Sequence, residues 1–355
     1  MQKESRQFLF VVLLTILSIY FLGIKFVSAQ KLTGKYADKF FYEKFDNQKN
    51  QVFMVNRNGK KAKKLFFVND YIGRIEVAAN NKLRFFTSPE MNKSYIYYYD
   101  LVTRHKKLVR KVKGYILQSG WYDKNNYAYI SETELPNYKF KLTLYLVTNG
   151  KKKKLAQWQG NVYGRGGYYE DDDSLNFSPD GKKIMHISTS SVRSSFDYNI
   201  YIFNRKGRLI NKIKNATHPT WISNSKIIYR KYQKGYLYKY NLKTEKSKRI
   251  KKIPKNSFDP KYLPENNKIA FWVGIKNPKV FVYNLKNKKL VNTKIRAAYP
   301  KWLDKERLLV NKARKCDPNN FMCPQTANFG ILNLKNKKFK IITKDLRKHY
   351  FTQYQ

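Results

Sequence analysis

The densest group of potential metal ligands in the sequence is an acidic run that follows a glycine-containing stretch. It comprises Tyr168, Tyr169, Glu170, Asp171, Asp172 and Asp173. Carboxylate oxygens are the ligands that Ca²⁺ prefers, so such a run could hold a divalent cation. The ligand spacing of a known calcium-binding loop is missing, however, and the same carboxylates would reduce self-repulsion in a basic chain. We therefore predict a candidate loop site here but no metal site.

Histidine is the second residue type that could do chemistry, but the four histidines, at positions 105, 186, 218 and 349, are widely separated in the chain. Only His218, directly before Pro219, is retained as a candidate site residue. The sequence has no Gly-x-Ser-x-Gly nucleophile motif and no His/Glu zinc motif. Paired carboxylates acting as acid and base are therefore the catalytic mechanism that the sequence excludes least. No catalytic residue is predicted and no cofactor is expected.

Cys316 and Cys323 are the only cysteines. In an exported protein, two thiols this close in sequence favour one disulfide that closes a surface loop. A metal site would need more ligands nearby, and Asp317 is the only such residue between them.

The elements that must position these residues follow from a repeated pattern of two hydrophobic strands joined by a turn rich in Asn, Gly and Lys. This pattern is typical of a β-hairpin. It occurs seven times, in copies that begin at Val55, Tyr99, Leu146, Phe203, Tyr240, Tyr283 and Leu332. The hairpins carry the lysines that we predict to form a basic binding face, namely Lys60, Lys61, Lys106, Lys107, Lys151, Lys152, Lys153, Lys154, Lys246, Lys248, Lys288, Lys289, Lys337 and Lys338.

A second strand pair precedes six of these hairpins, so that each unit has four strands, which we call a to d in chain order. Its aligned apolar residues are Val77, Trp121, Phe177, Trp221, Tyr262 and Trp302, which are 40 to 56 positions apart. This spacing is close to the length of a β-propeller blade. Aromatic residues make up 16% of the chain, which suits packing between twisted blades. The sequence predicts an all-β fold: one propeller of four-stranded blades over residues 37–355, with seven blades and six as the alternative.

One copy of the unit carries a family resemblance. The run FSPDGKKI from Phe177 to Ile184, followed by the apolar strand NIYIF from Asn199 to Phe203, resembles the TolB-type propeller repeat. The other copies keep Pro-x-Trp or Pro-x-Tyr but lack Pro-Asp-Gly. The resemblance implies the propeller fold and transfers no specific activity. Asp180 and Gly181 are expected to form a turn because both tolerate the backbone angles that a turn requires.

The two ends of the repeat region predict how the ring closes. Residues 39–45, 51–57 and 63–68 supply only three strands for the first unit, while residues 349–354 form a spare strand. We expect this C-terminal strand to enter the first blade as its innermost member and to remove the free sheet edge. Deleting residues 346–355 would then sharply lower the melting temperature.

Antiparallel strand order assigns every connection to one of two faces. The a–b and c–d turns share one face, so the lysine-rich c–d turns are expected to make it strongly cationic. The longest connections are expected on the other face: the b–c loops over residues 131–141, 188–198 and 312–328, and the d–a loop over residues 159–174. Loops held on a rigid scaffold often carry binding specificity.

The N-terminal segment predicts export. Lys3 and Arg6 precede the uncharged run 8–24, and small residues end at Ala29, which is the layout of a cleaved secretory signal peptide over residues 1–29. The run is also long enough for an uncleaved membrane anchor, which is the alternative. Both outcomes place the propeller in the periplasm or outside the cell.

Charge indicates the class of partner. The chain has 73 basic and 24 acidic residues, a net charge of +49. A compositional drift of the genome toward Lys and Asn codons could raise the lysine content, but it would also have raised the glutamate content. The excess of lysine therefore favours an anionic partner. The alternative is that the lysines only keep the surface soluble. Export disfavours nucleic acid. We predict a monomeric, non-catalytic binding or scaffold propeller at the cell envelope, engaging an anionic polymer, a glycan, a membrane surface or a protein partner. The alternative is a hydrolase or lyase acting on an anionic polysaccharide.

Overall fold

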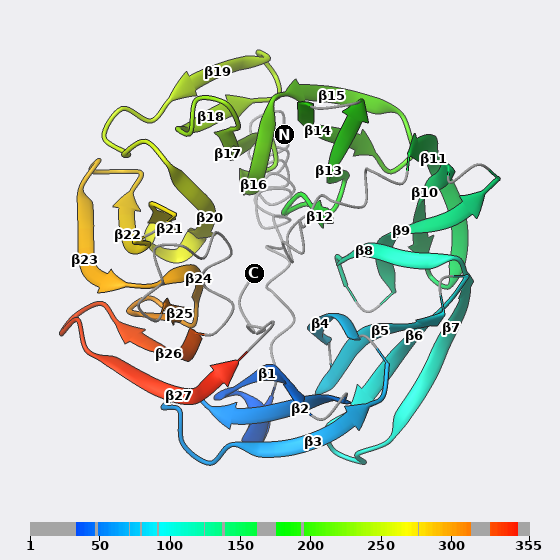
Figure 1. The fold of residues 1–355 in the computed structure, drawn as a ribbon, viewed down its shortest axis with the longest axis horizontal. Helices are drawn as coiled ribbons and strands as arrows, with labels where there is room; N and C mark the ends of the chain where they lie inside the picture. Colours follow the sequence, from blue (N-terminus) through cyan, green and yellow to red (C-terminus); the bar gives the residue numbers. More distant parts are fainter. Residues whose placement is uncertain are drawn as a thin grey trace, which may run out of the picture.

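The computed structural model describes residues 33–46, 49–70, 72–78, 80–90, 92–123, 125–136, 139–161, 175–192, 195–275, 277–313 and 327–346. These residues form seven antiparallel sheets arranged as blades around a common axis (Figure 1). The chain is therefore a seven-bladed β-propeller, as the sequence predicted, and the six-bladed alternative is wrong. The helices among the described residues are short 3-10 helices, and none of them is long and apolar enough to cross a membrane.

The strands follow one another around the ring in chain order. Blade 1 contains β1 (Lys39–Asp46), β2 (Lys49–Asn56) and β3 (Lys63–Val68), and blade 2 contains β4 (Ile72–Ala78), β5 (Lys82–Glu90), β6 (Lys93–Asp100) and β7 (Lys106–Lys113). Blade 3 contains β8 (Tyr115–Trp121), β9 (Asn126–Leu135), β10 (Lys139–Thr148) and β11 (Lys151–Asn161), and blade 4 contains β12 (Leu175–Phe177), β13 (Lys183–Val192), β14 (Ser195–Asn204) and β15 (Leu209–Lys214).

The remaining three blades have the same order. Blade 5 contains β16 (Ala216–Ser223), β17 (Lys226–Lys231), β18 (Leu237–Asn241) and β19 (Lys246–Arg249), and blade 6 contains β20 (Ser257–Leu263), β21 (Lys268–Val273), β22 (Lys279–Asn284) and β23 (Leu290–Arg296). Blade 7 contains β24 (Ala298–Trp302), β25 (Arg307–Ala313), β26 (Ala327–Asn333) and β27 (Phe339–Leu346). Two short 3-10 helices, η1 (Gly34–Tyr36) and η3 (Pro264–Asn266), lie outside the sheets.

Blade 1 shows three strands among the described residues, and the other six show four. In the four-stranded blades the first strand lies nearest the axis and the last lies at the rim (Figure 1). The predicted closing strand, residues 349–354, lies outside the described residues, so its entry into blade 1 stays a prediction. The same holds for the predicted signal peptide.

Both faces of each blade are buried, because successive side chains of a strand enter the two neighbouring interfaces. In β14, Ile200 and Ile202 pack with Trp221 of blade 5, whereas Phe203 packs with Leu146 of blade 3. This arrangement explains why the middle strands are apolar at nearly every position, as in other strands that are covered on both sides. One apolar cluster of this kind fills each of the seven junctions between neighbouring blades.

The junction between blade 7 and blade 1 joins the two ends of the described chain. Phe40, Tyr42 and Val55 of blade 1 pack against Leu309 and Phe329 of blade 7, and all five side chains are buried. The ring is therefore already held at this junction by side-chain packing among the described residues.

Backbone hydrogen bonds confirm the assignment of turns to two faces. On the lower face, as we name the face of the a–b and c–d turns, Leu242 N donates to Ser225 O at 2.8 Å and thereby links the two turns of blade 5. On the upper face, Tyr232 N donates to Asn215 O at 2.8 Å and links the b–c loop to the d–a connection. Equivalent bonds recur in other blades.

Two of the predicted long b–c loops are instead extended hairpins. Strands β9 and β10 pair from Asn126 with Thr148 to Leu135 with Lys139, and β13 and β14 pair out to Val192 with Ser195. Much of the predicted loop ranges 131–141 and 188–198 is therefore strand, because their Thr, Val, Phe and Tyr residues favour extended backbone. The centres of the other two predicted loops, 312–328 and 159–174, lie outside the described residues.

Candidate functional site

All fourteen predicted binding lysines are exposed. They lie at or just after the c–d turns, which begin with an asparagine in five blades, with Asp100 in blade 2 and with Thr148 in blade 3. In blade 6, Asn284 Oδ1 accepts hydrogen bonds from Lys286 N at 2.8 Å and Asn287 N at 3.1 Å, and Asn333 forms the same turn in blade 7. An asparagine side chain stabilises such a turn by replacing a backbone acceptor. These turns direct the lysines that follow them into solvent at the outer edge of the lower face.

No carboxylate of the described residues lies within ion-pair distance of these fourteen lysines. Acidic residues of the lower face lie in turns of both kinds. Asp123 and Asp180 of the a–b turns accept hydrogen bonds from the backbone amides of Asn125 at 2.7 Å and Lys182 at 3.1 Å. Asp180 thus stabilises its turn, as predicted, with Gly181 at a φ of +67°. Asp100 and Glu245 lie in the c–d turns of blades 2 and 5, where lysines outnumber carboxylates, so the outer edge of the lower face is cationic.

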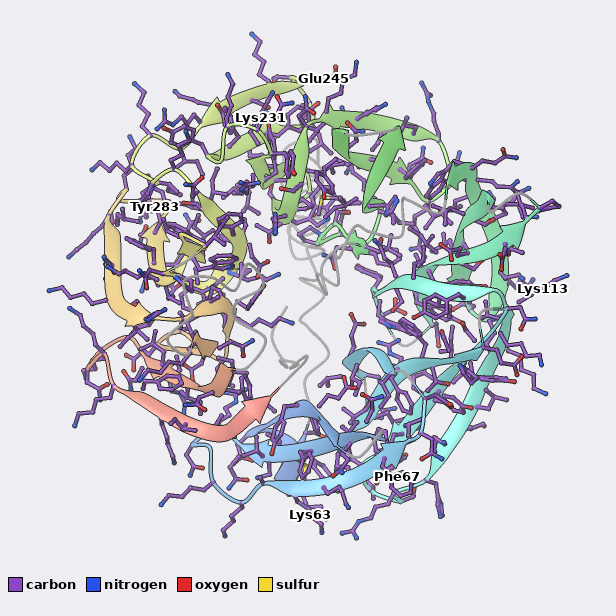
Figure 2. The ribbon with its side chains drawn as sticks, in the orientation of Figure 1. Lys63, Phe67, Lys113, Lys231, Glu245 and Tyr283 are labelled. Carbon is purple, nitrogen blue, oxygen red and sulfur yellow. The ribbon has the colours of Figure 1, made fainter. Side chains whose placement is uncertain are left out.

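The cationic surface is not confined to the lower face. Lys113, Lys251, Lys252 and Lys255 lie at the d–a connections of the upper face and are also exposed. Figure 2 shows Lys63 and Lys113 pointing outward from the rim. The prediction that one face concentrates the charge is therefore too narrow, because the outermost strands and their connections are lysine-rich along their length.

The lysines on the outermost strands also have a structural role. A strand at the edge of a sheet exposes unpaired backbone groups, and charged side chains, especially lysine, oppose pairing with another chain. Lys106 and Lys152 in addition place their ammonium groups 4.9 Å and 4.8 Å from the centres of the Tyr97 and Tyr145 rings. These contacts are worth about 0.5–1 kcal/mol each at exposed sites. Any binding role of the lysines must be separated from this one.

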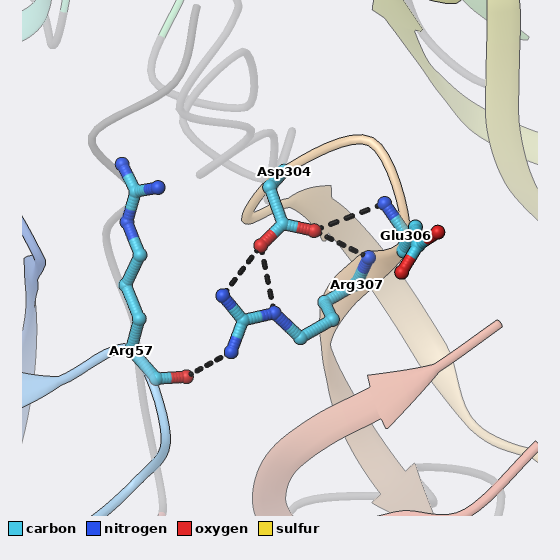
Figure 3. Close-up of polar contacts among 4 residues, drawn as sticks. All are labelled: Arg57, Asp304, Glu306 and Arg307. Atoms are coloured by element: carbon cyan, nitrogen blue, oxygen red, sulfur yellow. Dashed lines mark hydrogen bonds and ion pairs between the residues drawn. The ribbon is translucent and has the colours of Figure 1, made fainter. Parts of the chain in front are cut away.

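A cavity of about 580 Å³ opens on the lower face between blades 6 and 7. Its lining consists of Leu263, Glu265, Asp304, Lys305, Glu306, Arg307 and Asn333. The Arg307 guanidinium donates to Asp304 Oδ2 from Nε at 2.7 Å and to the Arg57 carbonyl oxygen of blade 1 at 2.9 Å (Figure 3). Asp304 Oδ1 in turn accepts the Glu306 and Arg307 amides. The charged groups of this cavity therefore fix a turn and join blade 7 to blade 1.

Replacing Arg307 by alanine is expected to lower the free energy of unfolding by about 1–2 kcal/mol, because Asp304 loses its charged donor and Arg57 O loses a hydrogen bond, at a site where the Arg307 side chain is 28% exposed. Urea unfolding measures the change. Lys305→Ala in the same turn is the matched control and is expected to have no measurable effect. An equal loss in both variants would contradict the role assigned to Arg307.

The upper face places His218 in a group of side chains near the axis. It comprises His218, Arg230, Phe258, Asp259, Lys261, Trp272 and Tyr299, and we call it the axial cluster. The innermost strands of blades 5, 6 and 7 each form a β-bulge near their start, at which His218, Asp259 and Tyr299 adopt left-handed φ angles of 49°, 49° and 52°. A proline follows each of them. Three adjacent blades thus present their bulge residues at equivalent positions.

The axial cluster combines stacked rings with cations. The Arg230 guanidinium lies 4.3 Å from the centre of the Phe258 ring, which stacks on Trp272 with centroids 4.4 Å apart and an interplanar angle of 16°. Trp272 in turn contacts Tyr299 at 5.5 Å. Lys261 Nζ lies 2.6 Å from Asp259 Oδ1. The contact of Arg230 with Phe258 is a cation–π interaction, and Phe258, Trp272 and Tyr299 form a run of three neighbouring rings.

His218 is neutral in this environment. Burial, together with the positive charges of Arg230 and Lys261, lowers its pKa from 6.5 to about 3. Its Nδ1 lies 2.9 Å from Thr217 Oγ1. A general base works best with a pKa near the operating pH, so His218 is poorly suited to transfer protons. It can still exchange hydrogen bonds in its neutral form.

The other predicted site residues lie outside the described residues: the acidic run Tyr168–Asp173 and the cysteines Cys316 and Cys323. Among the residues that the structure does describe, no three His, Cys, Asp or Glu side chains come together as metal ligands. The sequence reasoning retained His218 but missed its partners. The signal that could have found them is the residue before each inner-strand proline, since His218-Pro219, Asp259-Pro260 and Tyr299-Pro300 occupy the same place in three units.

No family model and no curated protein matches the sequence. Solved structures that are similar in fold include a prolyl endopeptidase, with a TM-score of 0.62 and 14% identity, over 90% of this chain and 50% of that one. An oligogalacturonate lyase in complex with manganese gives a TM-score of 0.57 and 12% identity, over 78% of this chain and 87% of that one. TolB from Acinetobacter baumannii gives a TM-score of 0.47 and 11% identity, over 87% of this chain and 64% of that one.

The similarities to the peptidase and the lyase show the propeller fold and nothing more specific, because both identities are very low. The chain spans about half the length of the peptidase. The TolB-type family is not confirmed, and the similarity to its repeat remains a resemblance in sequence. A shared fold does not imply a shared function, so the function must be argued from the chain's own residues.

Proposed function

We propose that this chain is an exported, non-catalytic binding propeller that attaches to an anionic polymer or surface of the cell envelope through the lysines at the outer edge of its lower face. The observation that carries the proposal is the exposure of all fourteen predicted lysines, with no carboxylate of the described residues in ion-pair distance. Unneutralised surface charge attracts anions over roughly a Debye length, about 8 Å at physiological salt.

The repeated architecture supports this proposal. Because the c–d turns recur around the ring, the cationic groups are distributed along a curved edge that an extended polymer or a membrane surface can follow. A lysine close to an anionic membrane contributes about 1 kcal/mol, so several lysines together suffice for peripheral attachment. The c–d turns carry two carboxylates, Asp100 and Glu245, beside the fourteen lysines, so the edge keeps a large excess of positive charge.

The state of the axial cluster favours binding over proton transfer. His218 is neutral because its pKa is held at about 3, and Asp259 is paired with Lys261 at 2.6 Å. His218 is therefore poorly suited to act as a general acid or base near neutral pH. This supports the non-catalytic form of the proposal for the residues that the structure describes.

The test uses two variants that each lose four positive charges. One replaces Lys151, Lys152, Lys153 and Lys154 of the lower face by glutamine, and the other replaces Lys234, Lys251, Lys252 and Lys255 of the upper face; all eight are exposed. Binding to polyphosphate and to phosphatidylglycerol vesicles is measured at 50 and 300 mM salt. We expect at least tenfold weaker binding for the lower-face variant, since four lysines contribute up to about 4 kcal/mol, and little change for the other.

Two outcomes would overturn the proposal. Equal weakening by both variants would show that only net charge matters. Unchanged binding together with aggregation of the lower-face variant would show that these lysines protect the open edges of the outermost strands. The two ligands separate a polymer partner from a membrane partner, because polyphosphate has no lipid and the vesicles have no extended chain.

A further inference from the structure

Exposed apolar side chains share the outer edge of the lower face with the lysines. Among the residues that the structure describes, ten large hydrophobic side chains are exposed. Those on an outermost strand or in its c–d turn are Phe67, Val102, Leu108, Val109, Leu209, Val291 and Ile341. Val102, Leu209 and Val291 are nearest to the lower face, because each lies in a c–d turn or at the start of the strand that follows it. Single apolar residues are ordinary on a protein surface, so their positions decide whether they have a role.

Val102 occupies a turn position that lysine occupies in four other blades. In each of these turns the first residue accepts a hydrogen bond from the amide two positions later. Asp100 Oδ1 accepts this bond from Val102 N at 2.9 Å. In the other four turns an asparagine accepts it from the amides of Lys206, Lys243, Lys286 and Lys335. Val102 is 61% exposed, so core packing does not account for an apolar side chain at this position.

The three apolar side chains are distributed around the ring. Val102 belongs to blade 2, Leu209 to blade 4 and Val291 to blade 6, and their outermost strands β7, β15 and β23 lie well apart at the rim (Figure 1). Leu209 is 45% exposed and Val291 is 37% exposed. The basic residues near them in sequence are Arg104, Lys106, Lys206, Arg208, Lys288 and Lys289. Because the three side chains share one face and are spread around it, a flat surface can contact all three at once.

Apolar side chains beside lysines indicate which kind of anionic partner fits this edge. A hydrated polymer such as polyphosphate offers charge but no apolar environment, so valine and leucine gain nothing from binding it. A bilayer offers both, because its acyl chains lie directly below the charged headgroups. Affinity for such a surface increases with the apolar area that is buried and with the attraction to anionic lipids. Lysines suit the same boundary, because their aliphatic stems lie along apolar surface while their ammonium groups stay in water.

We propose that the outer edge of the lower face docks on an anionic lipid bilayer, with Val102, Leu209 and Val291 inserted below the headgroups and the neighbouring lysines against the lipid phosphates. This inference rests on the proposed function and deepens it, because it names the partner of the lysine edge as a membrane and not a soluble polymer. The lower face then lies against the membrane, and the upper face points away from it.

The first experiment removes the apolar side chains and keeps every charge. Val102→Asn, Leu209→Gln and Val291→Thr are combined in the full chain, because asparagine suits a turn and threonine suits a strand. Binding is measured to vesicles of phosphatidylglycerol and phosphatidylcholine and to polyphosphate. We expect at least tenfold weaker binding of this triple variant to the vesicles, because less apolar surface leaves water on docking. Its binding to polyphosphate is expected to change less than twofold, and circular dichroism melts verify that it is folded.

The second experiment places a reporter in the turn of blade 2. Val102→Trp is bound to vesicles whose acyl chains carry bromine, which quenches the fluorescence of a nearby tryptophan. Ile275→Trp is the matched control, because Ile275 is 62% exposed but lies in the b–c connection of the upper face. After subtraction of the signal of the parent chain, which has five tryptophans, we expect at least twofold quenching in Val102→Trp and none in Ile275→Trp.

Three outcomes would overturn the inference: the parent chain does not bind the vesicles, the triple variant binds them like the parent, or Val102→Trp is quenched no more than Ile275→Trp. The glutamine variant of Lys151–Lys154 tests the lysine edge separately. If it loses affinity for vesicles and polyphosphate while the triple variant keeps both, the proposed function stands and the membrane inference fails. If the glutamine variant keeps both affinities, the proposed function fails, whatever the triple variant does.

Discussion

Replacing Phe329 by alanine is expected to lower the free energy of unfolding by about 3–5 kcal/mol, the usual cost of truncating a buried phenylalanine. Its side chain is fully buried in the junction between blades 7 and 1, with its ring centre 6.2 Å from that of Phe40 and 5.9 Å from that of Tyr42. The alanine variant leaves a cavity at the junction between blades 7 and 1, which joins the two ends of the described chain. Side chains of both blades therefore lose contacts there. Urea unfolding followed by circular dichroism measures the change.

The matched control for Phe329 is Ile341→Ala in β27 of the same blade. Ile341 is 41% exposed, so its truncation is expected to change the stability by less than about 0.5 kcal/mol. A similar small effect for Phe329→Ala would mean that side-chain packing at the seam does not hold the ring, and that closure depends on the predicted C-terminal strand. Comparing both variants with the chain lacking residues 346–355 separates these two contributions.

The blade count was predictable because hairpins and their turns are local features. The pattern around Asn284, with an apolar strand on either side, specifies a c–d turn within a few residues, and seven such patterns specify seven blades. The three strands predicted for blade 1 also agree with β1, β2 and β3 to within one or two residues.

The upper face was harder to predict because its features depend on pairing across the sheet. The segment 131–141 was predicted to be a long loop and contains Pro136, yet the residues on either side continue the ladder almost to the tip. Strand length is set by the partner strand as much as by local preference. Loop length could therefore be predicted only where both flanking strands ended together.

The axial cluster illustrates a different limit. His218, Asp259 and Tyr299 are far apart in sequence and belong to three residue types, so no motif connects them. They share a position only because the ring repeats and because each inner strand bulges before its proline. The exposure of the lysines was predictable, since turns are local. The grouping of Arg230 with Phe258 depended on how neighbouring blades pack.

The protein contains a second buried histidine whose protonation state the fold fixes. His186 is 4% exposed and lies between blades 3 and 4, with ring centres of Trp158 and Tyr201 5.3 Å and 6.5 Å away. Its Nδ1 donates to Gln118 Oε1 at 2.9 Å, while its Nε2 is buried and has no hydrogen-bond partner within the described part of the chain. Burial lowers the pKa of His186 to about 3, so the folded protein keeps it neutral.

Acidification is therefore expected to destabilise the fold through His186. Between its ordinary pKa of 6.5 and its folded pKa of about 3, the unfolded chain binds a proton that the folded chain does not, so stability is complete above pH 6.5 and falls as the pH decreases toward 3. At pH 4.5 the loss is about 2–3 kcal/mol at 1.36 kcal/mol for each pKa unit.

In His186→Phe, which keeps a ring for Trp158 and Tyr201, the difference in unfolding free energy between pH 7.5 and pH 4.5 is expected to shrink by that amount. The carboxylates and His218 make the same contribution to the pH dependence of stability in both proteins, so they cancel in the comparison. His105→Gln, at an exposed position, is the control substitution. An unchanged difference in His186→Phe would show that the folded protein accommodates the protonated ring.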